Sequence, residues 1–493
     1  MTKHKYLLGI DFGGGASKAT LLADDGTVAA SYTVEYPTLY PKEGYAEQNP
    51  EDWYRATKEN ICGILKKSGI DPTDIIAVSL DAATHTAVLC DENFNVIRPA
   101  IYWTDTRSVG EVAYLKENYG KYIAEKVMHA PDTIWSLPEL LWVKNNEPKD
   151  WARVRKILFA KDYVRHRLTG DYVTDFIEAE GSMLFDYNTL RWDSVLLGIL
   201  GIDAKMMPEI VSPLDIAGRV TAEAAADTGL AEGTQVLCGA TDTVMEVFAA
   251  GGASVGKMTL KLATAGRICV VTDKIYQDPN LINYSHFEKG LWYPGTATKS
   301  CAASYRWYRD TFGGDYRDLD SDAAKIEIGC GGLMFHPYLN GELTPYADPS
   351  LCASFIGVRA GHTKAHFTRA VLEGVALSML DCMTALDGIG IPHDETATII
   401  GGGGKSPLWR GIVSDCLGIT LVQKKHSDSS FGSAMLAGIA TGVFSDAAQA
   451  LEICNTEVSR TEPNMENRAK YAELFKTYKR VHDALQPIYS NRG

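Results

Sequence analysis

Apolar and polar positions at the start of the chain predict three β-strands followed by a helix. Between residues 6 and 36 the apolar runs are interrupted twice, by a glycine cluster at 13–15 and by Asp25-Gly26. Short apolar runs bounded by such residues are typical of strands joined by tight turns. Residues 49–66 change to a helical pattern, with Trp53 and Ile61 among the apolar positions.

The rest of the chain repeats this layout once. Residues 75–103 return to strands, with a turn at 91–95, and helices dominate 107–168. A second glycine-rich region from residue 233 again reads as strand, tight turn and strand. Because 493 residues are too many for one ordinary core, we expect a duplicated α/β architecture of two domains, 1–250 and 251–493, with a cleft between them. Residues 466–489 predict a long helix with a polar face.

Composition narrows the class of protein. The chain is 45% hydrophobic and 22% charged, as expected of a globular enzyme. Its 62 acidic and 48 basic residues give a net charge of -14, which argues against a nucleic-acid partner. No targeting segment or membrane-length apolar run is visible, and ten scattered cysteines predict reduced thiols, so we expect a cytoplasmic protein with no membrane partner.

The first candidate site is the glycine cluster that follows Asp11. Glycines between two strands allow backbone N–H groups to approach a phosphate, and a carboxylate at a strand end can hold magnesium through water. A plain hairpin turn is the alternative. A dinucleotide-binding fingerprint fits poorly, because Lys18 stands where its third glycine belongs and a strand follows.

A second cluster of glycines follows the predicted strand 396–400. A P-loop would need glycine at position 399, which is Ile399, so that interpretation fails. Four glycines before a helix starting at Ser406-Pro407 still suit a close approach of backbone to a nucleotide. The alternative is a glycine turn that only enters the helix.

Two further places have the chemistry of a sugar site. Asp242 precedes an apparent helix, where it is either an N-cap or a general base toward a substrate hydroxyl. Thr84 and His85 lie between strands, and Trp103 follows the second strand. Polar groups beside one aromatic wall suit a sugar, although a lone histidine is usually structural.

Together these segments resemble the FGGY carbohydrate kinases, most closely the branch that is similar to xylulokinases. Six stretches match the family's motifs in order along the chain: residues 9–18, 161–183, 239–243, 262–266, 337–349 and 401–418. The resemblance implies two actin-like, RNase H-like domains, the first for sugar and the catalytic base and the second for nucleotide. It also implies ATP and Mg²⁺ as cofactors, a small sugar as substrate and commonly a homodimer.

The resemblance assigns roles to individual residues. Asp242 falls on the catalytic aspartate and also contacts the sugar, and Asp11 on a metal-binding position. We expect the sugar to contact Asp81, Thr84, His85 and Trp103. The nucleotide is expected to contact Gly13, Gly14, Gly15, Ser17, Lys18, Thr264, Ala265, Gly266, Gly401, Gly402, Gly403, Gly404 and Lys405.

Departures from the family pattern bear on the substrate. Gly14 replaces a threonine, so one hydroxyl contact near the phosphates is missing. Ala263 and Leu343 replace a glycine and an arginine, and Thr84 stands where xylulokinases have methionine before the histidine. The resemblance implies a ketopentose such as xylulose, with ribulose, a polyol such as glycerol or erythritol, or a sugar acid as alternatives. The departures predict that D-xylulose is used less well than the best substrate. A sugar sensor without catalysis is a further alternative.

Overall fold

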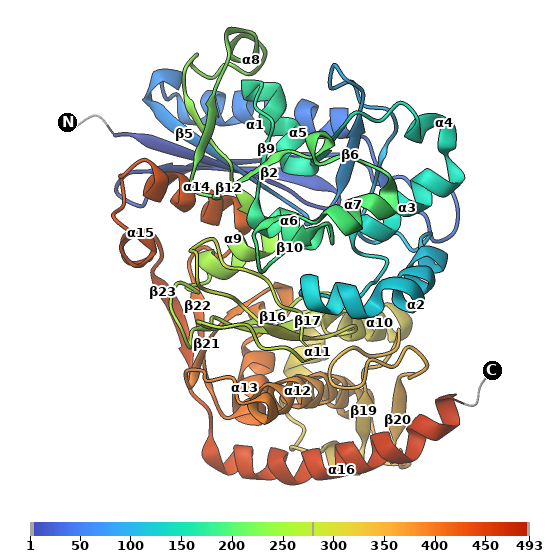
Figure 1. Cartoon of the computed structure of the whole chain (residues 1–493). Coiled ribbons are helices and arrows are strands. Elements are labelled where there is room, and N and C mark those ends of the chain that lie inside the picture. Colours follow the sequence, from blue (N-terminus) through green and yellow to red (C-terminus); the bar gives the residue numbers. More distant parts are fainter. Residues whose placement is uncertain (1–3, 279–280, 491–493) are drawn as a thin grey trace. The chain divides into compact units, whose positions relative to one another are not determined.

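The computed structural model describes residues 4–278 and 281–490, which form two compact units. Unit 1 comprises Met1–Ala249, Tyr284–Lys289 and His426–Thr456, and unit 2 comprises Ala250–Asn283, Gly290–Lys425 and Glu457–Gly493. Figure 1 shows the elements of each unit along the chain.

Unit 1 is built on a sheet that begins with the predicted strands. The strand order is β13-β14-β5-β1-β2-β3, with the short β15 also pairing with β5. Strands β1, β2 and β3 are antiparallel, β5 and β14 run parallel to β1, and β13 is antiparallel again. The strands are β1 (Tyr6–Phe12), β2 (Ala16–Ala23), β3 (Val28–Glu35), β5 (Ile75–Ala82), β13 (Ile216–Arg219), β14 (Gln235–Leu237) and β15 (Ala240–Thr241). Gly26 in the β2–β3 turn has a φ of 84°, which favours glycine.

Helices cover both faces of this sheet (Figure 1). The predicted helix α1 (Pro50–Ser68) is capped by Asn49 and buries Trp53 and Ile61 against β2 and β3. On β1, a Cβ at Gly9 would lie 1.9 Å from a carbonyl of α14 (Ser429–Ala440), so this helix lies directly on the strand.

The position of α14 makes the two compact units discontinuous in sequence. A cut at residue 250 assigns all of 251–493 to the second domain, whereas α14 and α15 (Ala447–Cys454) return to unit 1. The apolar residues of α14 are buried against β1, β5 and α9 (Asp242–Ala249), and this packing is invisible in local sequence patterns.

The remaining elements of unit 1 surround the sheet, and the helices expected over 107–168 are present. They are β4 (Glu47–Gln48), β6 (Ala87–Cys90), β7 (Ala100–Ile101), α2 (Val109–Lys126), α3 (Ser136–Asn146), α4 (Pro148–Trp151), β8 (Lys156–Phe159), α5 (Ala160–Thr169), β9 (Val173–Asp175), α6 (Phe176–Gly181), β10 (Phe185–Asp186), β11 (Arg191–Trp192), α7 (Ser194–Leu200), β12 (Glu209–Val211) and α8 (Ala222–Thr228).

Unit 2 has a sheet with the same succession of strand directions. The order is β18-β17-β16-β21-β22-β23, with β16, β21 and β22 parallel and the outer strands antiparallel. The strands are β16 (Met258–Leu262), β17 (Gly266–Val270), β18 (Gly295–Thr298), β21 (Thr396–Ile400), β22 (Thr420–Lys424) and β23 (Glu457–Thr461). The duplicated α/β layout expected from the sequence is therefore confirmed.

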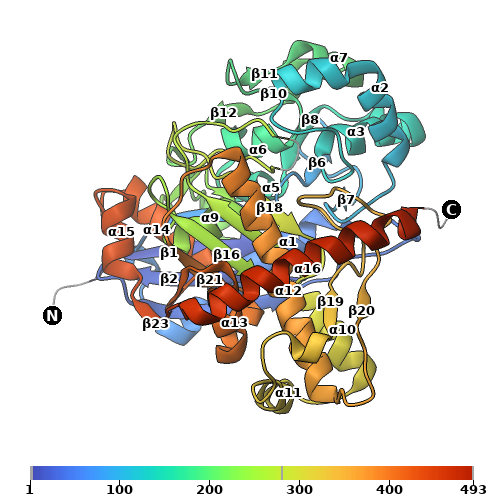
Figure 2. The ribbon, with the colours of Figure 1, turned by 90° about the horizontal axis from the view of Figure 1, so that it is seen from below.

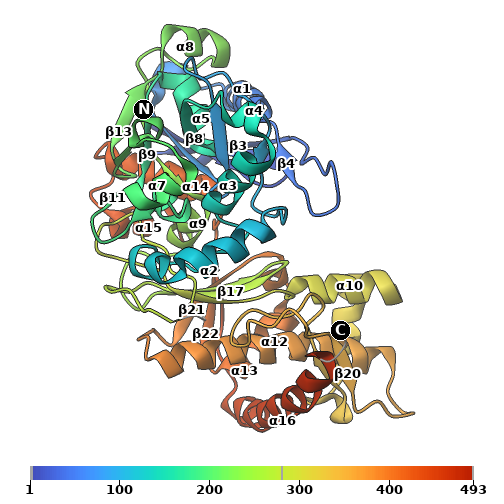
Figure 3. The same ribbon diagram turned by 45° about the vertical axis from the view of Figure 1, so that its right-hand side comes forward.

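Three helices form two layers in unit 2. The long helix α12 (Lys364–Ile389) packs beside α13 (Pro407–Leu417), and the predicted C-terminal helix α16 (Met465–Ser490) lies across both. Figure 2 and Figure 3 show α16 on the outside of this pair. Tyr471 and Tyr478 anchor α16 because both side chains are fully buried. The other elements are α10 (Ala302–Phe312), α11 (Tyr316–Ala323), β19 (Met334–His336) and β20 (Ser354–Ile356).

The ten cysteines are free thiols, most of them buried, as expected. None of the helices within residues 4–278 and 281–490 combines the length and apolar character needed to cross a bilayer.

Candidate active site

Three aspartates meet at the carboxyl ends of adjacent strands in unit 1. Asp11 on β1 is in register with Asp81 on the parallel strand β5. The short strand β15 pairs with the same end of β5, and Asp242 directly follows it as the first residue of α9. Because parallel strands end at one edge of a sheet, the topology brings together residues that are far apart in sequence.

Burial and mutual repulsion disfavour full ionisation of these carboxyl groups. Burial, followed by the charge of Asp242, raises the pKa of Asp11 to about 7. Burial, followed by the charge of Asp11, raises the pKa of Asp81 well above its ordinary value. A cation or a proton bound at this edge would therefore reduce the repulsion between the carboxylates.

The structure corrects the expectation that Asp81 contacts a sugar. Its side chain has no exposed surface, and its Oδ2 accepts a hydrogen bond from Ser433 Oγ on α14 at 2.5 Å. Asp81 is still within β5, and it is covered by the helix that returns from the second half of the chain. It supports Asp11 from within the sheet and does not face solvent.

The glycine turn between β1 and β2 presents its backbone to solvent. Gly14 and Gly15 are exposed, and Gly13 N–H donates to Ala16 O at 3.0 Å, which closes the turn. Gly14 O accepts from Thr38 Oγ1 at 2.5 Å and from Gln48 Nε2 at 3.0 Å. The turn is therefore fixed from one side and open on the other.

The side chains of Ser17 and Lys18 face opposite sides of the sheet, because successive side chains of a strand alternate between its two faces. Ser17 is fully buried and accepts a hydrogen bond from Asn60 Nδ2 of α1 at 2.9 Å, so the expected contact with a nucleotide is wrong for this side chain. Lys18 is partly exposed and forms an ion pair of 3.0 Å with Asp428, the N-cap of α14. Lys18 therefore remains a candidate.

Thr84 and His85 occupy the turn that follows β5. His85 has a φ of 70°, which is unusual for a non-glycine residue. Its N–H donates to Glu178 Oε1 at 2.6 Å and its carbonyl accepts from Ser136 Oγ at 2.6 Å. Backbone held in a rare conformation by buried partners on both sides is typical of a functional turn.

The His85 ring is neutral and packed among aromatic side chains. Burial, followed by repulsion from His129, lowers its pKa well below the ordinary value. Nδ1 lies 3.8 Å from Glu178 Oε1 and, among the described residues, has no hydrogen-bond partner. The ring centroid lies 4.8 Å from that of Trp135 and 6.0 Å from that of Tyr284, so these two residues form the aromatic wall.

The sequence predicted Trp103 as the aromatic wall of the sugar site and did not predict Trp135 or Tyr284. Trp103 is 44% exposed and lies beside Tyr102, with ring centroids 5.9 Å apart. Tyr284 belongs to the short segment 284–289 that joins unit 1 from far along the chain, and no local signal points to it. Trp135 precedes α3, where its aromatic character was the only available signal.

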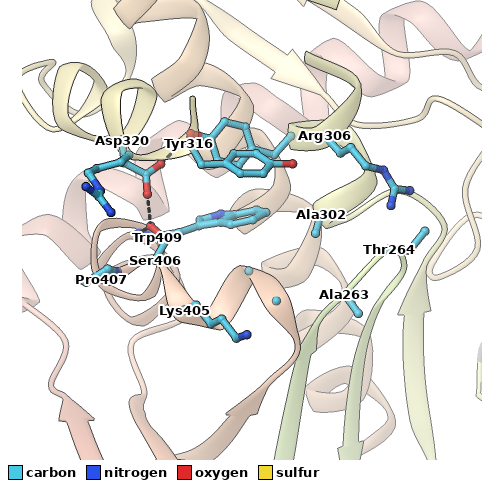
Figure 4. Close-up of a pocket in the computed structure, with 14 residues that line it drawn as sticks. Ala263, Thr264, Ala302, Arg306, Tyr316, Asp320, Lys405, Ser406, Pro407 and Trp409 are labelled. Atoms are coloured by element: carbon cyan, nitrogen blue, oxygen red, sulfur yellow. Dashed lines mark hydrogen bonds between the residues drawn. The ribbon is translucent and has the colours of Figure 1, made fainter. Parts of the chain in front are cut away.

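Unit 2 contains a cavity of about 720 Å³ beside the glycine loop that follows β21. Most of its lining comes from α10, α11 and the start of α13. The lining residues are Ala263, Thr264, Ala302, Tyr305, Arg306, Tyr316, Arg317, Asp320, Gly402, Gly403, Lys405, Ser406, Pro407 and Trp409. Figure 4 shows Asp320 and Ser406 at one end of this lining and Arg306 with Thr264 at the other.

One end of the cavity is aromatic and is held by a partly buried hydrogen-bond network. The ring centroid of Tyr305 lies 5.0 Å from that of Tyr316 and 5.7 Å from that of Trp409. Asp320 accepts from Tyr305 Oη at 2.7 Å and from Ser406 Oγ at 2.6 Å, which ties α11 to α10 and α13 (Figure 4). An aromatic slot with cationic residues at its edge suits a planar ring that carries anionic groups.

The four glycines of the loop have different surroundings. A Cβ at Gly402 would meet no atom of the described residues within 4 Å, so its backbone faces the open cavity. A Cβ at Gly403 would lie 2.8 Å from the Trp409 ring, and Gly401 needs its φ of 88°. Gly404 O accepts from Arg410 and Gln423, so Gly401 and Gly404 shape the loop and Gly402 borders the cavity.

The β16–β17 turn is less uniform than expected. Thr264 and Ala265 are exposed, and Thr264 lines the cavity with the exposed Lys405. Gly266 is buried, and a Cβ there would lie 2.6 Å from Met379 Sδ. Gly266 is thus a glycine for close packing, and the expected nucleotide contact does not extend to it.

Oxygen donors around Asp11 suit a hard cation such as Mg²⁺, which prefers carboxylates, water and phosphate oxygens. Over the described residues, no group of three or more histidine, cysteine or acidic side chains is arranged to hold a metal ion by itself. The donor set therefore fits a cation that is brought and mostly coordinated by nucleotide phosphates, and not a cation that the protein holds alone.

Two domain models of one known family match most of the chain. The N-terminal domain of the FGGY family of carbohydrate kinases matches residues 6–249, and its C-terminal domain matches residues 270–441. A xylulose kinase of Bacillus subtilis is 32% identical over 483 residues, which cover 97% of each chain. A gluconokinase of the same species is 27% identical, covering 98% of this chain and 97% of its own.

A solved structure agrees with the sequence matches. The crystal structure of a xylulose kinase from Rhodospirillum rubrum superposes with a TM-score of 0.91 at 26% identity, covering 99% of this chain and all of its own. The expected fold class, α/β with two actin-like domains, is therefore confirmed.

Proposed function

Because this chain belongs to the FGGY family of carbohydrate kinases, we propose that it transfers the γ-phosphoryl group of ATP to a hydroxyl of a small sugar. The observation that carries the proposal is the position of Asp242. Its carboxylate begins α9 at the strand edge that also holds Asp11, next to the exposed glycine turn of unit 1. A proton acceptor, a cation-binding carboxylate and a phosphate-sized turn thus share one edge of one sheet.

In the proposed reaction Asp242 accepts the proton of the attacking hydroxyl. That oxygen forms a bond to the γ-phosphorus while the bond between this phosphorus and ADP breaks, so the products are a sugar phosphate and ADP. Thr243 Oγ1 donates to Asp242 Oδ1 at 3.1 Å, which orients the carboxylate. In this proposal the backbone N–H groups of the exposed residues Gly14 and Gly15 donate to phosphoryl oxygens.

Unit 2 supplies the nucleotide site in this proposal. The adenine ring enters the aromatic slot of Tyr305, Tyr316 and Trp409, and Gly402 allows the close approach of the ribose. Arg306 and Lys405 at the edge favour the charged phosphates. Mg²⁺ would neutralise phosphate charge when bound, and Asp11 is the residue that we assign to hold it, directly or through water.

A ketopentose such as xylulose is the substrate that we propose. The named relatives include xylulose kinases, and a neutral His85 beside Trp135 and Tyr284 suits an uncharged polyhydroxyl chain. A gluconokinase is also similar, so a sugar acid is an alternative substrate. Ribulose and small polyols share the same chemistry and remain alternatives.

The test is a coupled ADP-release assay over xylulose, ribulose, erythritol, glycerol and gluconate, with a sugar-free blank. We expect sugar-dependent turnover that is highest with a ketopentose and lost in Asp242→Asn. Absence of turnover with every sugar would contradict the proposed function. A gluconate preference would keep the reaction and overturn the substrate.

A further inference from the structure

The glycine turn of unit 1 has no side-chain hydroxyl at residue 14, and a tyrosine from another element occupies the space. A Cβ added to Gly14 would lie 2.9 Å from Tyr102 Oη, 3.5 Å from Tyr102 Cζ and 3.7 Å from Tyr102 Cε1. Tyr102 directly follows β7, so its side chain reaches the turn from outside the β1–β2 hairpin. The contact that excludes a side chain at Gly14 is therefore made by a hydroxyl group.

The Tyr102 hydroxyl is suited to donate a hydrogen bond. The side chain is 6% exposed, so its position is fixed by packing. Burial raises the pKa of the phenol above its ordinary value, and the charges of Asp242 and Asp11 raise it further, so the proton is retained. A protonated phenol can donate one hydrogen bond through its O–H.

Other hydroxyls around the turn already donate to its carbonyl groups. Tyr36 Oη donates to Gly13 O at 2.6 Å, and Thr38 Oγ1 donates to Gly14 O at 2.5 Å. Ser17 Oγ accepts from Asn60 in the interior. Tyr102 thus differs from these neighbours in presenting its hydroxyl at the side-chain position of Gly14, close to Asp11 and Asp242.

We propose that the Tyr102 hydroxyl donates a hydrogen bond to an oxygen of the transferred phosphoryl group and supplies the hydroxyl that Gly14 lacks. A donor aimed at the oxygens where charge is redistributed stabilises the transition state. The inference rests on the proposed kinase function, and it assigns Tyr102 a direct contact with the substrate of that reaction.

The geometry also provides a rescue experiment. In Tyr102→Phe the atom at 2.9 Å is gone, and the ring atoms that remain lie at ordinary contact distance from a Cβ at residue 14. Gly14→Ser then fits and restores a hydroxyl at the turn. In the wild-type background the same serine meets Tyr102 Oη, so Gly14→Ser alone is expected to disturb the site.

The test compares kcat and KM for ATP in four proteins: wild type, Tyr102→Phe, Gly14→Ser and the double variant. We expect Tyr102→Phe to lower kcat by about 10- to 100-fold, as for loss of one donor to a charged group, and the double variant to recover most of that loss. Tyr122→Phe is the matched control, because its hydroxyl donates to Asp193, the N-cap of α7, and its loss should leave turnover unchanged.

The outcomes separate the inference from the function beneath it. An inactive wild type would overturn the proposed kinase function. An active wild type with unchanged kcat in Tyr102→Phe would overturn only the role of Tyr102. A loss in Tyr102→Phe that Gly14→Ser deepens would also overturn it, because Tyr102 would then act as a packing wall and not through its hydroxyl.

Discussion

The two sheets of this protein share one strand topology but have opposite charges at the same place. In unit 1 the second-last residues of β1 and β5, Asp11 and Asp81, are in register. In unit 2 the corresponding strands β16 and β21 pair Lys261 with Ile400. The neighbouring strand carries a cation in both units, Lys18 opposite Asp11 and Arg267 opposite Lys261. The same backbone therefore ends in carboxyl groups in one unit and in cationic and apolar side chains in the other.

The turns beside these positions also differ. The unit 1 turn is exposed at Gly14 and Gly15, with the Tyr102 hydroxyl beside it. The unit 2 turn packs on the start of α10, where Cys301 N–H and Ala302 N–H donate to its carbonyl groups at 3.0 and 2.7 Å. Carboxyl groups can accept protons and hold a cation, whereas cationic side chains attract phosphates. One architecture thus serves proposed chemistry in unit 1 and proposed nucleotide binding in unit 2.

The largest effect is expected from neutralising the carboxylate that only unit 1 provides at the start of α9. Asp242→Asn keeps the shape but cannot accept a proton, so kcat should fall by roughly 10²- to 10⁴-fold with little change in Tm. Asp227→Asn, a partly exposed carboxylate of the same unit, is the control and should retain turnover. Near wild-type kcat in Asp242→Asn would contradict the assignment of proton transfer to unit 1.

A change in the unit 2 loop should affect nucleotide binding and not proton transfer. Gly402→Val places a branched side chain in the open cavity, so we expect the Kd for ADP to rise by about 10- to 100-fold, as for an overpacked site. Gly411→Val on α13 is the matched control, because a side chain there also meets open space but outside the cavity lining. Calorimetry with ADP measures both, and equal weakening in the two variants would indicate a general disturbance of the unit.

The carboxylate pair should make the stability of the protein depend on pH. Folding raises the pKa of Asp11 from 3.8 to about 7, so the folded protein holds a proton that the unfolded chain has released over that range. The contribution of this group to the stability of the folded protein is therefore lost as pH rises toward 7. Asp11→Asn removes the destabilisation that an ionised Asp11 causes above that pH. Without Mg²⁺ and ATP, we expect Asp11→Asn to raise Tm by roughly 2 °C or more at pH 8.

That gain should shrink at pH 5, where the wild-type carboxyl group is mostly protonated in the folded state. Thermal unfolding followed by circular dichroism at both pH values measures it. A gain of equal size at pH 5 and pH 8, or a loss at pH 8, would mean that Asp11 is not held under repulsion.

Local patterns predicted the parts of the site that are contiguous in sequence. The glycine turn, the loop at Gly402 and the first residue of α9 follow from strand ends and small residues. Local patterns did not predict which side chains face the site, because this depends on elements that are distant in sequence and pack against it. Ser433 on α14 buries Asp81, and Tyr284 reaches His85 from a distant segment. The aromatic slot of unit 2 was also missed, because α10 and α11 carry no periodic sign of a cavity.

The smallest effect separates the sequence-based expectation for Ser17 from its position in the structure. Ser17→Ala should leave the Kd for ATP unchanged and lower the free energy of unfolding by about 0.5–1.5 kcal/mol, because it removes the bond to Asn60. Ser31→Ala on β3 is the control and should change neither quantity. Weaker ATP binding in Ser17→Ala at unchanged stability would show that this side chain does contact the nucleotide.

The division of labour between the two units is tested most directly by calorimetric titration of ADP into Asp242→Asn and Gly402→Val under identical conditions. The account predicts that Asp242→Asn, although its turnover is lost, binds ADP as wild type does, and that Gly402→Val binds it at least about tenfold more weakly. Weakened ADP binding in Asp242→Asn together with wild-type binding in Gly402→Val would contradict the account.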